Sequence, residues 1–490
     1  MARYVIDLDR LEETGKVARV NAEKLGVHLL MALKSFPLPA ALPTLAKYVE
    51  GFTCSGLYEA KLVNSSICRF VDSSGENSSI CRFVDSSNRV DDNCSNNFNQ
   101  TIQSKNRRID ESINSPIHVH APAYTDEEMP EVISTCSHIV FNSLAQLEKF
   151  GPAAKAAGRS VGLRINPGFS SADCLAYDPY CPDSRFGVLF DELEDYLQTH
   201  SSIRRFADSS NAVAENCSNN FNQTIQSKNR KIEESINLID GLHLHALCEG
   251  YADQFADLVE RLADRFGALL AARDGTRALS GLKWINLGGG EVINDPAFAS
   301  PRAIAAVQKL KAVLSSPTLY IEPSEYLVRY AGSLEATVLD VIHREKDIAI
   351  LDVSASCHAT DLLLFNMKPD IISPPLLEST NQSSSSSSSS RVDDHIFSES
   401  TNFPKSKVTI LAAVSCLAGD VFGEYEFARP LKAGDKVIFG GLGSYSFAQL
   451  SWFNGIRHPD IVIRSGGAER VVRHWDYRDF AAEFAAPALT

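Results

Sequence analysis

Buried strands and amphipathic helices alternate through residues 27–330, and this alternation restricts the fold more than any other feature of the sequence. The segment VHLLMALKS (27–35) is almost continuously apolar, as expected of a parallel strand covered on both faces. The segment YADQFADLVERLADRFGALLAARD (251–274) instead places its apolar residues on one helical face. Further strand candidates are IHVHAPA (117–123), HIVFNS (138–143), VGLRINP (161–167), LIDGLHLHAL (238–247), LKWINLGGG (282–290) and TLYIEPS (318–324). The alternation predicts a parallel β/α architecture, closed into a barrel.

The sequence pattern changes after about residue 330. Short strands joined by turns then follow one another, which favours a separate, mainly β domain. The strand candidates are SLEATVLDVI (333–342), DIAILDVSA (347–355), KVTILAAV (407–414), DKVIFGGLG (435–443) and DIVIRSG (460–466). We therefore expect a barrel at 27–330 and a β domain at 331–490, with residues 1–26 packing against the β domain.

Near-identical polar segments interrupt both parts of the chain. Residues 94–114 (CSNNFNQTIQSKNRRIDESIN) return at 217–237 with two conservative changes, and a third segment contains a polyserine run. These segments hold too few apolar residues to offset the entropy lost on ordering. They predict disordered polar inserts at 63–115, 201–237 and 377–407.

The first two inserts fall between a predicted helix and the next strand, on the barrel face opposite the one that carries active sites. Loop-closure entropy grows slowly with length, so we expect these two inserts to leave the chemistry intact. The third insert lies in the β domain, not far in sequence from Cys416. Two alternatives stay open: the repeats form a shared binding motif, or they are unspliced or mobile sequence absent from the mature protein.

The charge balance argues against a nucleic-acid partner. The chain has 61 acidic and 47 basic residues and a net charge of -14, which suits a cationic small substrate, although simple solubility also explains it. No apolar run approaches the roughly 18 residues of a membrane span. The segment Met1–Arg10 contains Asp7 and Asp9 and lacks the apolar core of a signal peptide, which predicts a cytoplasmic protein. The 11 cysteines show no CxxC pair and no His/Cys spacing typical of a metal site, so no metal is expected.

Two candidate functional features follow predicted strands. Lys34 ends the first strand, where desolvation would lower the pKa of the amine and suit it to attack a carbonyl group. The plainer interpretation is a lysine at the exposed end of its strand. Gly288, Gly289 and Gly290 follow a later strand, where a glycine loop can bring backbone amides close to a phosphate, although three glycines also form plain turns.

The other polar candidates indicate a functional site only when they are considered together. Glu322 ends the IEPSE strand, where a carboxylate suits the ring nitrogen of a cofactor, or is simply an exposed loop acid. His243 and His245 share one strand face; no third metal ligand is apparent, so core or ring-stacking histidines are favoured. Cys416, which precedes Asp420, indicates no more than packing by itself.

Taken in order, these segments resemble the carboxynorspermidine decarboxylase family, which belongs to the pyridoxal 5'-phosphate (PLP) dependent decarboxylases of the alanine-racemase/ornithine-decarboxylase fold. The matching motifs are ALKSF, RINP, HLHALCE, LGGG, IEPSE, CLAGD and FGGLGSYS, with YDPYCPDSRFG (177–187), SCHATDLL (356–363) and FNG (453–455) in support. The resemblance covers nearly the whole chain outside the inserts. It implies PLP as the cofactor, a PLP-binding (β/α)8 barrel with a β domain, and a homodimer with composite active sites.

The resemblance also implies a role for each matching residue. The implied cofactor ligands are Lys34 (covalent), His245 (stacked on the ring), Gly288, Gly289, Gly290 and Tyr445 (at the phosphate) and Glu322 (at the ring nitrogen). Cys416, delivered from the partner subunit, is the implied proton donor once carbon dioxide has left. Asp420, Asp361 and Glu325 are candidates to hold the distal ammonium groups of the substrate, because a polyamine tail needs acidic partners.

A few positions depart from the family pattern. Ser324 stands where the family usually has glycine, and Glu291 and Val292 stand where it usually has two histidines. The expected reaction is decarboxylation of carboxynorspermidine or carboxyspermidine to norspermidine or spermidine. The alternatives are a decarboxylase of another diamino acid, such as diaminopimelate, and a catalytically silent regulatory homologue. Retention of the predicted lysine, glutamate and cysteine together favours an enzyme.

Overall fold

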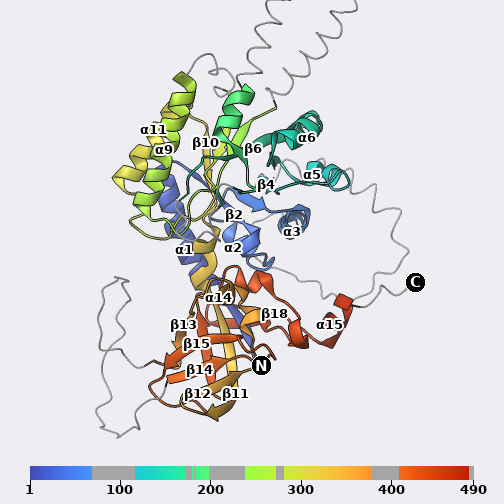
Figure 1. Ribbon diagram of the computed structural model, residues 1–490, viewed down its shortest axis with the longest axis vertical. Coiled ribbons are helices and arrows are strands. Elements are labelled where there is room, and N and C mark those ends of the chain that lie inside the picture. Colours follow the sequence, from blue (N-terminus) through green and yellow to red (C-terminus); the bar gives the residue numbers. More distant parts are fainter. Residues whose placement is uncertain are drawn as a thin grey trace, which may run out of the picture. The chain divides into compact units, whose positions relative to one another are not determined.

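The computed structural model describes residues 1–68, 116–170, 179–180, 183–197, 238–271, 281–376 and 408–484 (Figure 1). The chain divides into two compact units. Arg10–Val328 form the first, and Met1–Asp9 together with Arg329–Thr490 form the second.

The predicted inserts at 63–115, 201–237 and 377–407 lie outside the described residues, apart from residues 63–68. Those residues continue helix α3 (Leu57–Cys68), in which Val63 is fully buried. The helix therefore extends past the position where the sequence predicted the first insert to begin.

Eight parallel strands of the described residues close into a barrel in the first unit. In order around the barrel they are β2 (His28–Ala32), β3 (Gly51–Cys54), β4 (Ile117–His120), β5 (His138–Phe141), β6 (Ser160–Asn166), β8 (Gly241–His243), β9 (Trp284–Asn286) and β10 (Thr318–Ile321). Pairing of β10 with β2 and of β5 with β6 leaves no open edge, and the short β7 (Val188–Leu189) pairs in parallel with the end of β6. The predicted (β/α)8 barrel is thereby confirmed.

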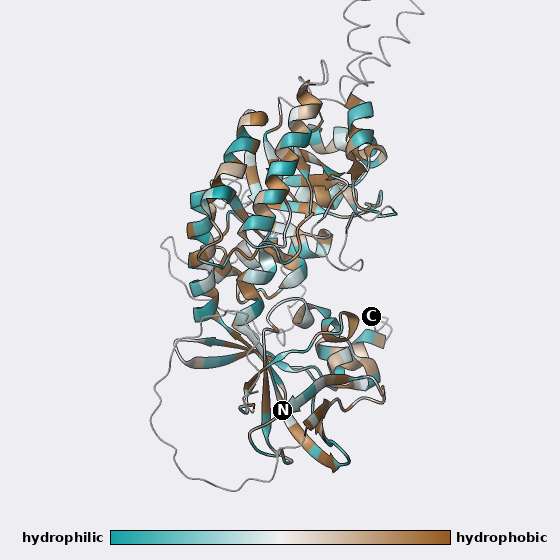
Figure 2. Cartoon of the chain, turned by 60° about the vertical axis from the view of Figure 1, so that its left-hand side comes forward, coloured by the Kyte–Doolittle hydropathy of each residue, from teal (hydrophilic) through white to brown (hydrophobic). Residues whose placement is uncertain are grey.

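Helices cover the outside of this barrel. They are α1 (Leu8–Leu25), α2 (Leu42–Leu45), α3, α5 (Met129–Thr135), α6 (Leu144–Ala156), α9 (Ala252–Ala271), α11 (Pro301–Val313) and α12 (Ser324–Val328). The hydroxyls of Ser143 and Ser300 cap α6 and α11 by accepting bonds from backbone amides of the first turn. Figure 2 shows hydrophilic and hydrophobic residues alternating along the outer helices, as expected of helices with one covered face. None of the described helices is long and apolar enough to cross a membrane.

Trp284 fills part of the barrel interior because two neighbouring strands carry glycine there. A Cβ atom at Gly241 would lie 2.0 Å from Trp284 Cδ2, and one at Gly162 would lie 2.4 Å from its Cη2 atom. The indole nitrogen of Trp284 donates a 2.8 Å hydrogen bond to Ser160 Oγ, which satisfies its polar group. Glycine at these two positions therefore makes room for the largest side chain of the barrel core.

The second unit is mainly β, as predicted. Its strands are β1 (Arg3–Asp7), β11 (Gly332–His343), β12 (Asp347–Leu351), β13 (Asp370–Ser373), β14 (Val408–Ala412), β15 (Val421–Glu426), β16 (Lys436–Gly440), β17 (Asp460–Ser465) and β18 (Ala468–Arg473). They form one sheet in the order β15-β14-β12-β11-β1-β17-β18, with β16 also paired to β11 and β13 to β16. Short helices α13 (Ala355–His358) and α14 (Thr360–Leu364) follow β12, and α15 (Tyr477–Phe484) follows β18.

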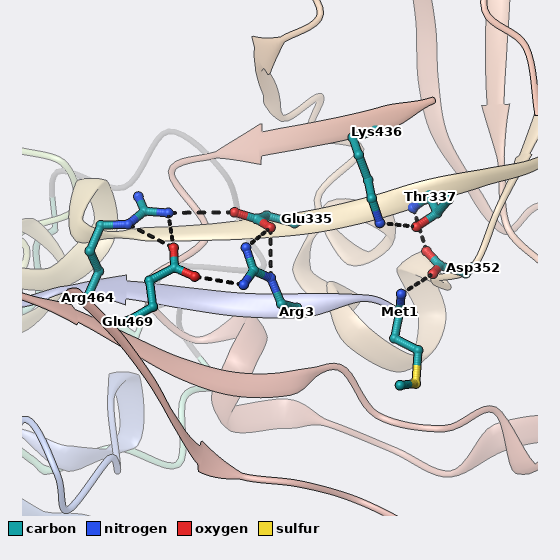
Figure 3. Close-up of polar contacts among 8 residues, drawn as sticks. All are labelled: Met1, Arg3, Glu335, Thr337, Asp352, Lys436, Arg464 and Glu469. Carbon is teal, nitrogen blue, oxygen red and sulfur yellow. Dashed lines mark hydrogen bonds and ion pairs between the residues drawn. The ribbon is translucent and has the colours of Figure 1, made fainter. Parts of the chain in front are cut away.

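Strand β1 lies inside this sheet, paired antiparallel with β11 and parallel with β17. Four alternating charges link these strands to β18 (Figure 3): Arg3 contacts Glu335 at 2.6 Å and Glu469 at 2.7 Å. Arg464 contacts the same two carboxylates, at 3.8 and 2.7 Å respectively. Because each carboxylate contacts both guanidinium groups, the network connects the chain's first strand to strands from its last third.

The expectation that residues 1–26 pack with the β domain differs from the structure beyond Asp9. Most of helix α1 belongs to the barrel unit. Its buried Asn21 donates side-chain hydrogen bonds to the carbonyl oxygens of Ile293 and Asp295, at 2.9 and 2.7 Å. The amide of Asn21 thus attaches α1 to the segment that follows the glycine loop.

Candidate active site

A cavity of about 700 Å³ opens at the carboxyl ends of the barrel strands. Three residues singled out from the sequence line it: Lys34 after β2, His245 after β8 and Glu322 after β10. The carboxyl ends of the strands are the face on which barrel enzymes build their sites. A second hollow of about 530 Å³, beside Asn142 and Tyr196, contains none of the predicted site residues.

Lys34 lies in a short 3-10 turn, Leu33–Ser35, directly after β2. Its neighbours Leu33 and Ser35 are buried, whereas the Lys34 side chain is exposed and borders the cavity. The interpretation of Lys34 as a desolvated amine is therefore wrong for this structure. The strand ends at Ala32, and the turn then carries the ammonium group out of the core.

Glu322 is a buried carboxylate at the wall of the same cavity, with a relative exposure of 9%. Asn286 Nδ2 donates a 2.6 Å hydrogen bond to Glu322 Oε1, and His243 Nε2 lies 3.8 Å from the same oxygen. Burial raises the pKa of Glu322, against the opposing effects of the Lys34 charge and the Asn286 hydrogen bond. A cationic N–H placed in the cavity would favour the ionised form of this carboxylate.

The glycine loop packs against the segment after β8. Gly288 has φ +81° and Gly290 φ +102°, a backbone conformation that residues with a Cβ rarely adopt. A Cβ atom at these positions would lie 2.3 Å from the Leu244 carbonyl oxygen and 2.2 Å from the Leu247 carbonyl oxygen, respectively. Both the dihedral angles and the close approach to these carbonyl oxygens therefore require glycine.

His245 is tied to that loop by a hydrogen bond. Gly289 N donates to His245 Nδ1 at 3.0 Å, so this ring nitrogen carries no proton. Burial first, and then the nearby charges of Lys34 and Arg164, hold the pKa of His245 well below its ordinary value. His245 is therefore a neutral imidazole with its remaining proton on Nε2. The amide of Gly288 is also occupied, by Asn286 Oδ1 at 2.9 Å.

His243 is buried and also lines the cavity. Its ring packs edge-on against His120, with the ring centroids 4.9 Å apart. Burial and the charge of Arg164 lower its pKa, so it is neutral as well. Among the described residues no group of three or more His, Cys, Asp and Glu side chains is arranged to hold a metal ion.

Arg164 and His120 are cavity residues that the sequence analysis did not single out. Arg164 lies near the carboxyl end of the apolar strand β6, and its Nη1 lies 3.4 Å from His120 Nε2. Its guanidinium also lies 4.4 Å from the ring centre of Phe186, and Arg185 packs on the same ring at 4.3 Å. The signal that identified Lys34, a cation at the end of a buried strand, applies equally to the arginine of RINP.

The other predicted site residues belong to the β unit. Cys416 is exposed in the connection between β14 and β15, with its Sγ 3.3 Å from Asn454 Oδ1. Tyr445 has φ +46°, an uncommon backbone conformation for a bulky residue and one found at functional sites. Asp361 lies in α14, where burial raises its pKa and a hydrogen bond from Gln449 acts in the opposite direction.

Asp420 is buried and accepts hydrogen bonds from three serines. Ser354, Ser356 and Ser415 donate hydroxyl bonds to its Oδ2 at 2.6, 2.8 and 2.5 Å. The amide of Ser356 donates to Oδ1 at 3.0 Å. Burial acts to raise the pKa of Asp420, but these bonds outweigh it and lower the pKa below its ordinary value. The carboxylate thus joins the Cys416 connection to the segment after β12.

The two units therefore hold different parts of the predicted site. The barrel unit contains Lys34, His245, Gly288, Gly289, Gly290, Glu322 and Glu325, and the β unit contains Asp361, Cys416, Asp420 and Tyr445. Glu325 lies in α12, three residues after Glu322.

Together these features define the class of protein to which the fold belongs. The fold, an eight-stranded barrel with a β unit built from both ends of the chain, is that of the alanine-racemase/ornithine-decarboxylase type of decarboxylase, and it is shared with diaminopimelate decarboxylase from Helicobacter pylori (13% identity, TM-score 0.65, 99% of this chain and 96% of that one). No family model matches the chain.

Particular relatives narrow the class. The chain is 27% identical to the carboxynorspermidine/carboxyspermidine decarboxylase of Campylobacter jejuni, over 98% of this chain and 97% of that protein. It is 24% identical to the carboxyaminopropylagmatine decarboxylase of Synechocystis, over 97% and 93% of the two chains. A crystal structure of carboxynorspermidine decarboxylase from Campylobacter jejuni with norspermidine matches with a TM-score of 0.65 and 26% identity, over 99% of both chains. The resemblance found in the sequence is thereby confirmed: the chain is a relative of the carboxynorspermidine/carboxyspermidine decarboxylases.

Proposed function

We propose that the protein is a PLP-dependent decarboxylase that converts carboxynorspermidine or carboxyspermidine to norspermidine or spermidine. One observation carries the proposal: the barrel cavity brings together Lys34, the buried Glu322 and His245, which is bonded to the glycine loop. The full-length similarity to decarboxylases of carboxylated polyamines supports this choice of substrate.

The residues of the cavity fit PLP. Lys34 presents an amine to the cavity, and the glycine loop is bonded to His245, which lines the same cavity, so the loop is our candidate to hold the phosphate. Glu322 offers a buried carboxylate to a protonated ring nitrogen, a partner that would offset the cost of burying its charge. Bound PLP supplies an electron sink for the pair left behind when the bond to the departing carboxylate breaks.

The chain's own groups then bind the substrate and move protons. The neutral ring of His245 provides a flat face for the cofactor ring, and its Nδ1 stays fixed by Gly289. Cys416 donates a proton to the substrate's α carbon after carbon dioxide leaves, and we propose that it does so from the partner subunit of a homodimer. Tyr445 adds a phosphate contact from the β unit.

The distal ammonium groups of the substrate need acidic partners. Glu325, Asp361 and Asp420 stay our candidates. The raised pKa of Asp361 fits a carboxyl group that gains a cationic partner when the substrate binds. Asp420 already accepts four hydrogen bonds, so we assign it a second role, holding the Cys416 connection in place.

Borohydride reduction with peptide mapping tests the cofactor assignment. Reduction of the bond between PLP and its lysine gives a stable pyridoxyl amine, which we expect on Lys34. The surface lysine Lys47, which pairs with Glu12, serves as the control: Lys47→Ala should still be labelled at Lys34, and Lys34→Ala should lose the label. A label on another lysine, or none, would show that the assignment is wrong and would favour a silent homologue.

A substrate panel tests the specificity. We expect turnover of carboxynorspermidine and carboxyspermidine to exceed that of diaminopimelate. Carboxyaminopropylagmatine belongs in the panel because a relative that covers nearly the whole chain is named for it. Preference for diaminopimelate would transfer the protein to the other decarboxylase group that shares its fold.

A further inference from the structure

We propose that Ser324 is a positioning residue that fixes the turn bearing Lys34, so that its amine faces the carbonyl carbon of the bound cofactor. The inference rests on the proposed PLP-dependent function and assigns a role to a side chain that the matching motif does not require. Ser324 is the first residue of α12 and is buried, with a relative exposure of 3%.

Strand β2, which precedes the turn of Lys34, is paired with only one of its two neighbouring strands at its carboxyl end. On one side β2 stays paired with β3 as far as Ala32, which lies opposite Thr53. On the other side its pairing with β10 ends where Leu29 lies opposite Ile321. The last three residues of β2 therefore have no strand partner in β10, although Lys34 follows only two residues after Ala32.

The hydroxyl of Ser324 closes this gap. Ala32 N donates a 2.5 Å hydrogen bond to Ser324 Oγ, a contact between residues 292 positions apart in the chain. A second hydroxyl, that of Ser35, donates to the carbonyl oxygen of Ala32 at 2.9 Å. Both polar groups of the Ala32 backbone are thus held by serines, and Ala32 is the residue from which the Lys34 turn departs.

The segment that contains Ser324 also carries the other side of the cofactor site. Ser324 N donates to the Glu322 carbonyl oxygen at 2.7 Å, and Glu322 N donates to the Gly288 carbonyl oxygen at 2.5 Å. One short stretch therefore connects the glycine loop, the carboxylate for the ring nitrogen and the turn of the lysine. Loss of the hydroxyl would leave a buried N–H of Ala32 without its acceptor, whereas on the Glu322 side it would remove only a long 3.4 Å bond to the Glu322 carbonyl oxygen. The larger effect therefore falls on the lysine side of this arrangement.

Two ligands separate positioning of Lys34 from general damage to the site. PLP has the aldehyde that Lys34 must reach, whereas 4-deoxypyridoxine 5'-phosphate keeps the ring and phosphate but lacks the aldehyde. For Ser324→Ala we expect about a tenfold loss of PLP affinity and a slower borohydride-trapped labelling of Lys34, the size of effect that one unsatisfied buried donor produces. Affinity for the deoxy compound should change by less than about twofold, because its contacts do not involve the lysine.

Matched variants complete the test. Ser300→Ala removes another hydroxyl that accepts a backbone N–H, at 3.2 Å from Ala303 N, but it lies at the start of α11 and outside the cavity. It should lower the melting temperature of the cofactor-free protein without a change in either affinity. Ser324→Thr restores a hydroxyl and should recover PLP affinity, and Ser324→Gly should behave like Ser324→Ala.

Each outcome bears either on the positioning role of Ser324 or on the proposed function. Equal weakening of both ligands by Ser324→Ala, or wild-type labelling kinetics, would overturn the positioning role. Failure of the wild-type protein to bind either ligand would instead remove the proposed function. If Ser324→Ala does not fold, the comparison of Ser324→Gly with Ser324→Thr decides the question in the same way.

Discussion

Two buried glutamates near the cavity show how much the surroundings of a residue decide its role. Glu322 receives a hydrogen bond from Asn286 and lies beside His243, so its charge has partners. Glu291, the residue directly after the glycine loop, is fully buried, and neither of its carboxyl oxygens has a hydrogen-bond partner among the described residues. Burial raises the pKa of Glu291 well above its ordinary value, and the nearby charge of Glu322 acts in the same direction. The structure thus accommodates Glu291 as a neutral acid.

Glu291 should make the protein less stable as the pH rises. The folded state keeps the Glu291 proton at pH values where the unfolded state loses it, so the loss begins near pH 4.5 and continues until the raised folded pKa is reached. The slope from this group is about 1.4 kcal/mol per pH unit. Glu291→Gln removes the titration, and its melting temperature should therefore exceed that of the wild type at pH 8 but not at pH 4.5. Exposed Glu13→Gln is the control, and an equal pH response of Glu291→Gln and wild type would contradict the argument.

For single residues, the sequence predicted which residues belong to the site better than it predicted their burial and their contacts. Lys34, His245 and Glu322 were recognisable because they follow buried strands and match motifs, and the structure brings all three to one cavity. The burial of Glu291 was not predictable, because a glutamate after three glycines has no periodic pattern to indicate a covered face. Arg164 was missed although it is a cation near the carboxyl end of a buried strand, which is the signal that identified Lys34.

The barrel strands could be predicted as elements, but their side-chain contacts could not. Long apolar segments indicated seven of the eight strands, because a strand covered on both faces needs apolar residues at nearly every position. The short strand β3 (Gly51–Cys54) was missed. The packing of Trp284 over Gly162 and Gly241 depends on the register of three strands, which the sequence does not display. Those glycines looked like ordinary strand residues.

Gly241→Ala should therefore disrupt the barrel although alanine is small. Its methyl group would lie 2.0 Å from Trp284 Cδ2, a buried and closely packed ring. Overpacking of this kind costs about 1–3 kcal/mol, and we expect a correspondingly lower midpoint of chemical unfolding. Gly267→Ala in helix α9 is the matched control, since a Cβ atom there meets nothing within 4 Å and alanine favours a helix.

A double variant checks the cause of the Gly241→Ala effect. Trp284→Leu alone leaves a cavity and should also destabilise the protein. Combined with Gly241→Ala it should cost less than the sum of the two single changes, because the smaller side chain makes room for the new methyl group. Additive losses would mean that Trp284 is not what the methyl group meets.

At the scale of the whole molecule, the chain builds its β unit from both ends. Strand β1 is paired on both sides by strands from the last third of the sequence. The sequence predicts that residues 1–26 pack with the β domain, yet only Met1–Asp9 belong to the β unit. The limit has a physical reason: beyond Asp9 the chain forms α1, whose Asn21 bonds to the barrel segment after the glycine loop.

The predicted inserts should be dispensable for folding and cofactor binding. Replacement of residues 69–115 or 201–237 by a short Gly/Ser linker shortens a connection that the sequence predicts to be a surface loop, and closure of such loops costs little. The first replacement begins after Cys68, so that α3 stays intact. We expect soluble protein that binds PLP with wild-type affinity and melts within a few degrees of the full chain. Insoluble protein after either replacement would show that the segment is an integral part of the fold.

If the active site is composite, as we propose, it makes a prediction about pairs of subunits. Cys416 is the proposed proton donor, and removal of a general acid typically lowers the rate about a hundredfold to ten-thousandfold. Cys416→Ala should keep the borohydride label on Lys34 while turnover falls by that factor. In some of the remaining turnovers the proton should go to the cofactor carbon that carries the aldehyde in free PLP, instead of the substrate's α carbon. Those turnovers should release an aldehyde together with pyridoxamine phosphate.

Mixing two inactive variants then tests whether the two residues come from different chains. Lys34→Ala and Cys416→Ala proteins should each be nearly inactive alone. If each site takes Lys34 from one chain and Cys416 from its partner, half of the randomly formed dimers are mixed, and each mixed dimer has one complete site and one site that lacks both residues. The mixture should then recover about a quarter of wild-type activity.

Exchange is followed with two differently tagged proteins, and two portions of the Lys34→Ala protein mixed together provide the baseline. If tagged subunits exchange and activity stays at this baseline, both residues serve a site within one chain, because a mixed dimer would then contain two sites that each lack one group.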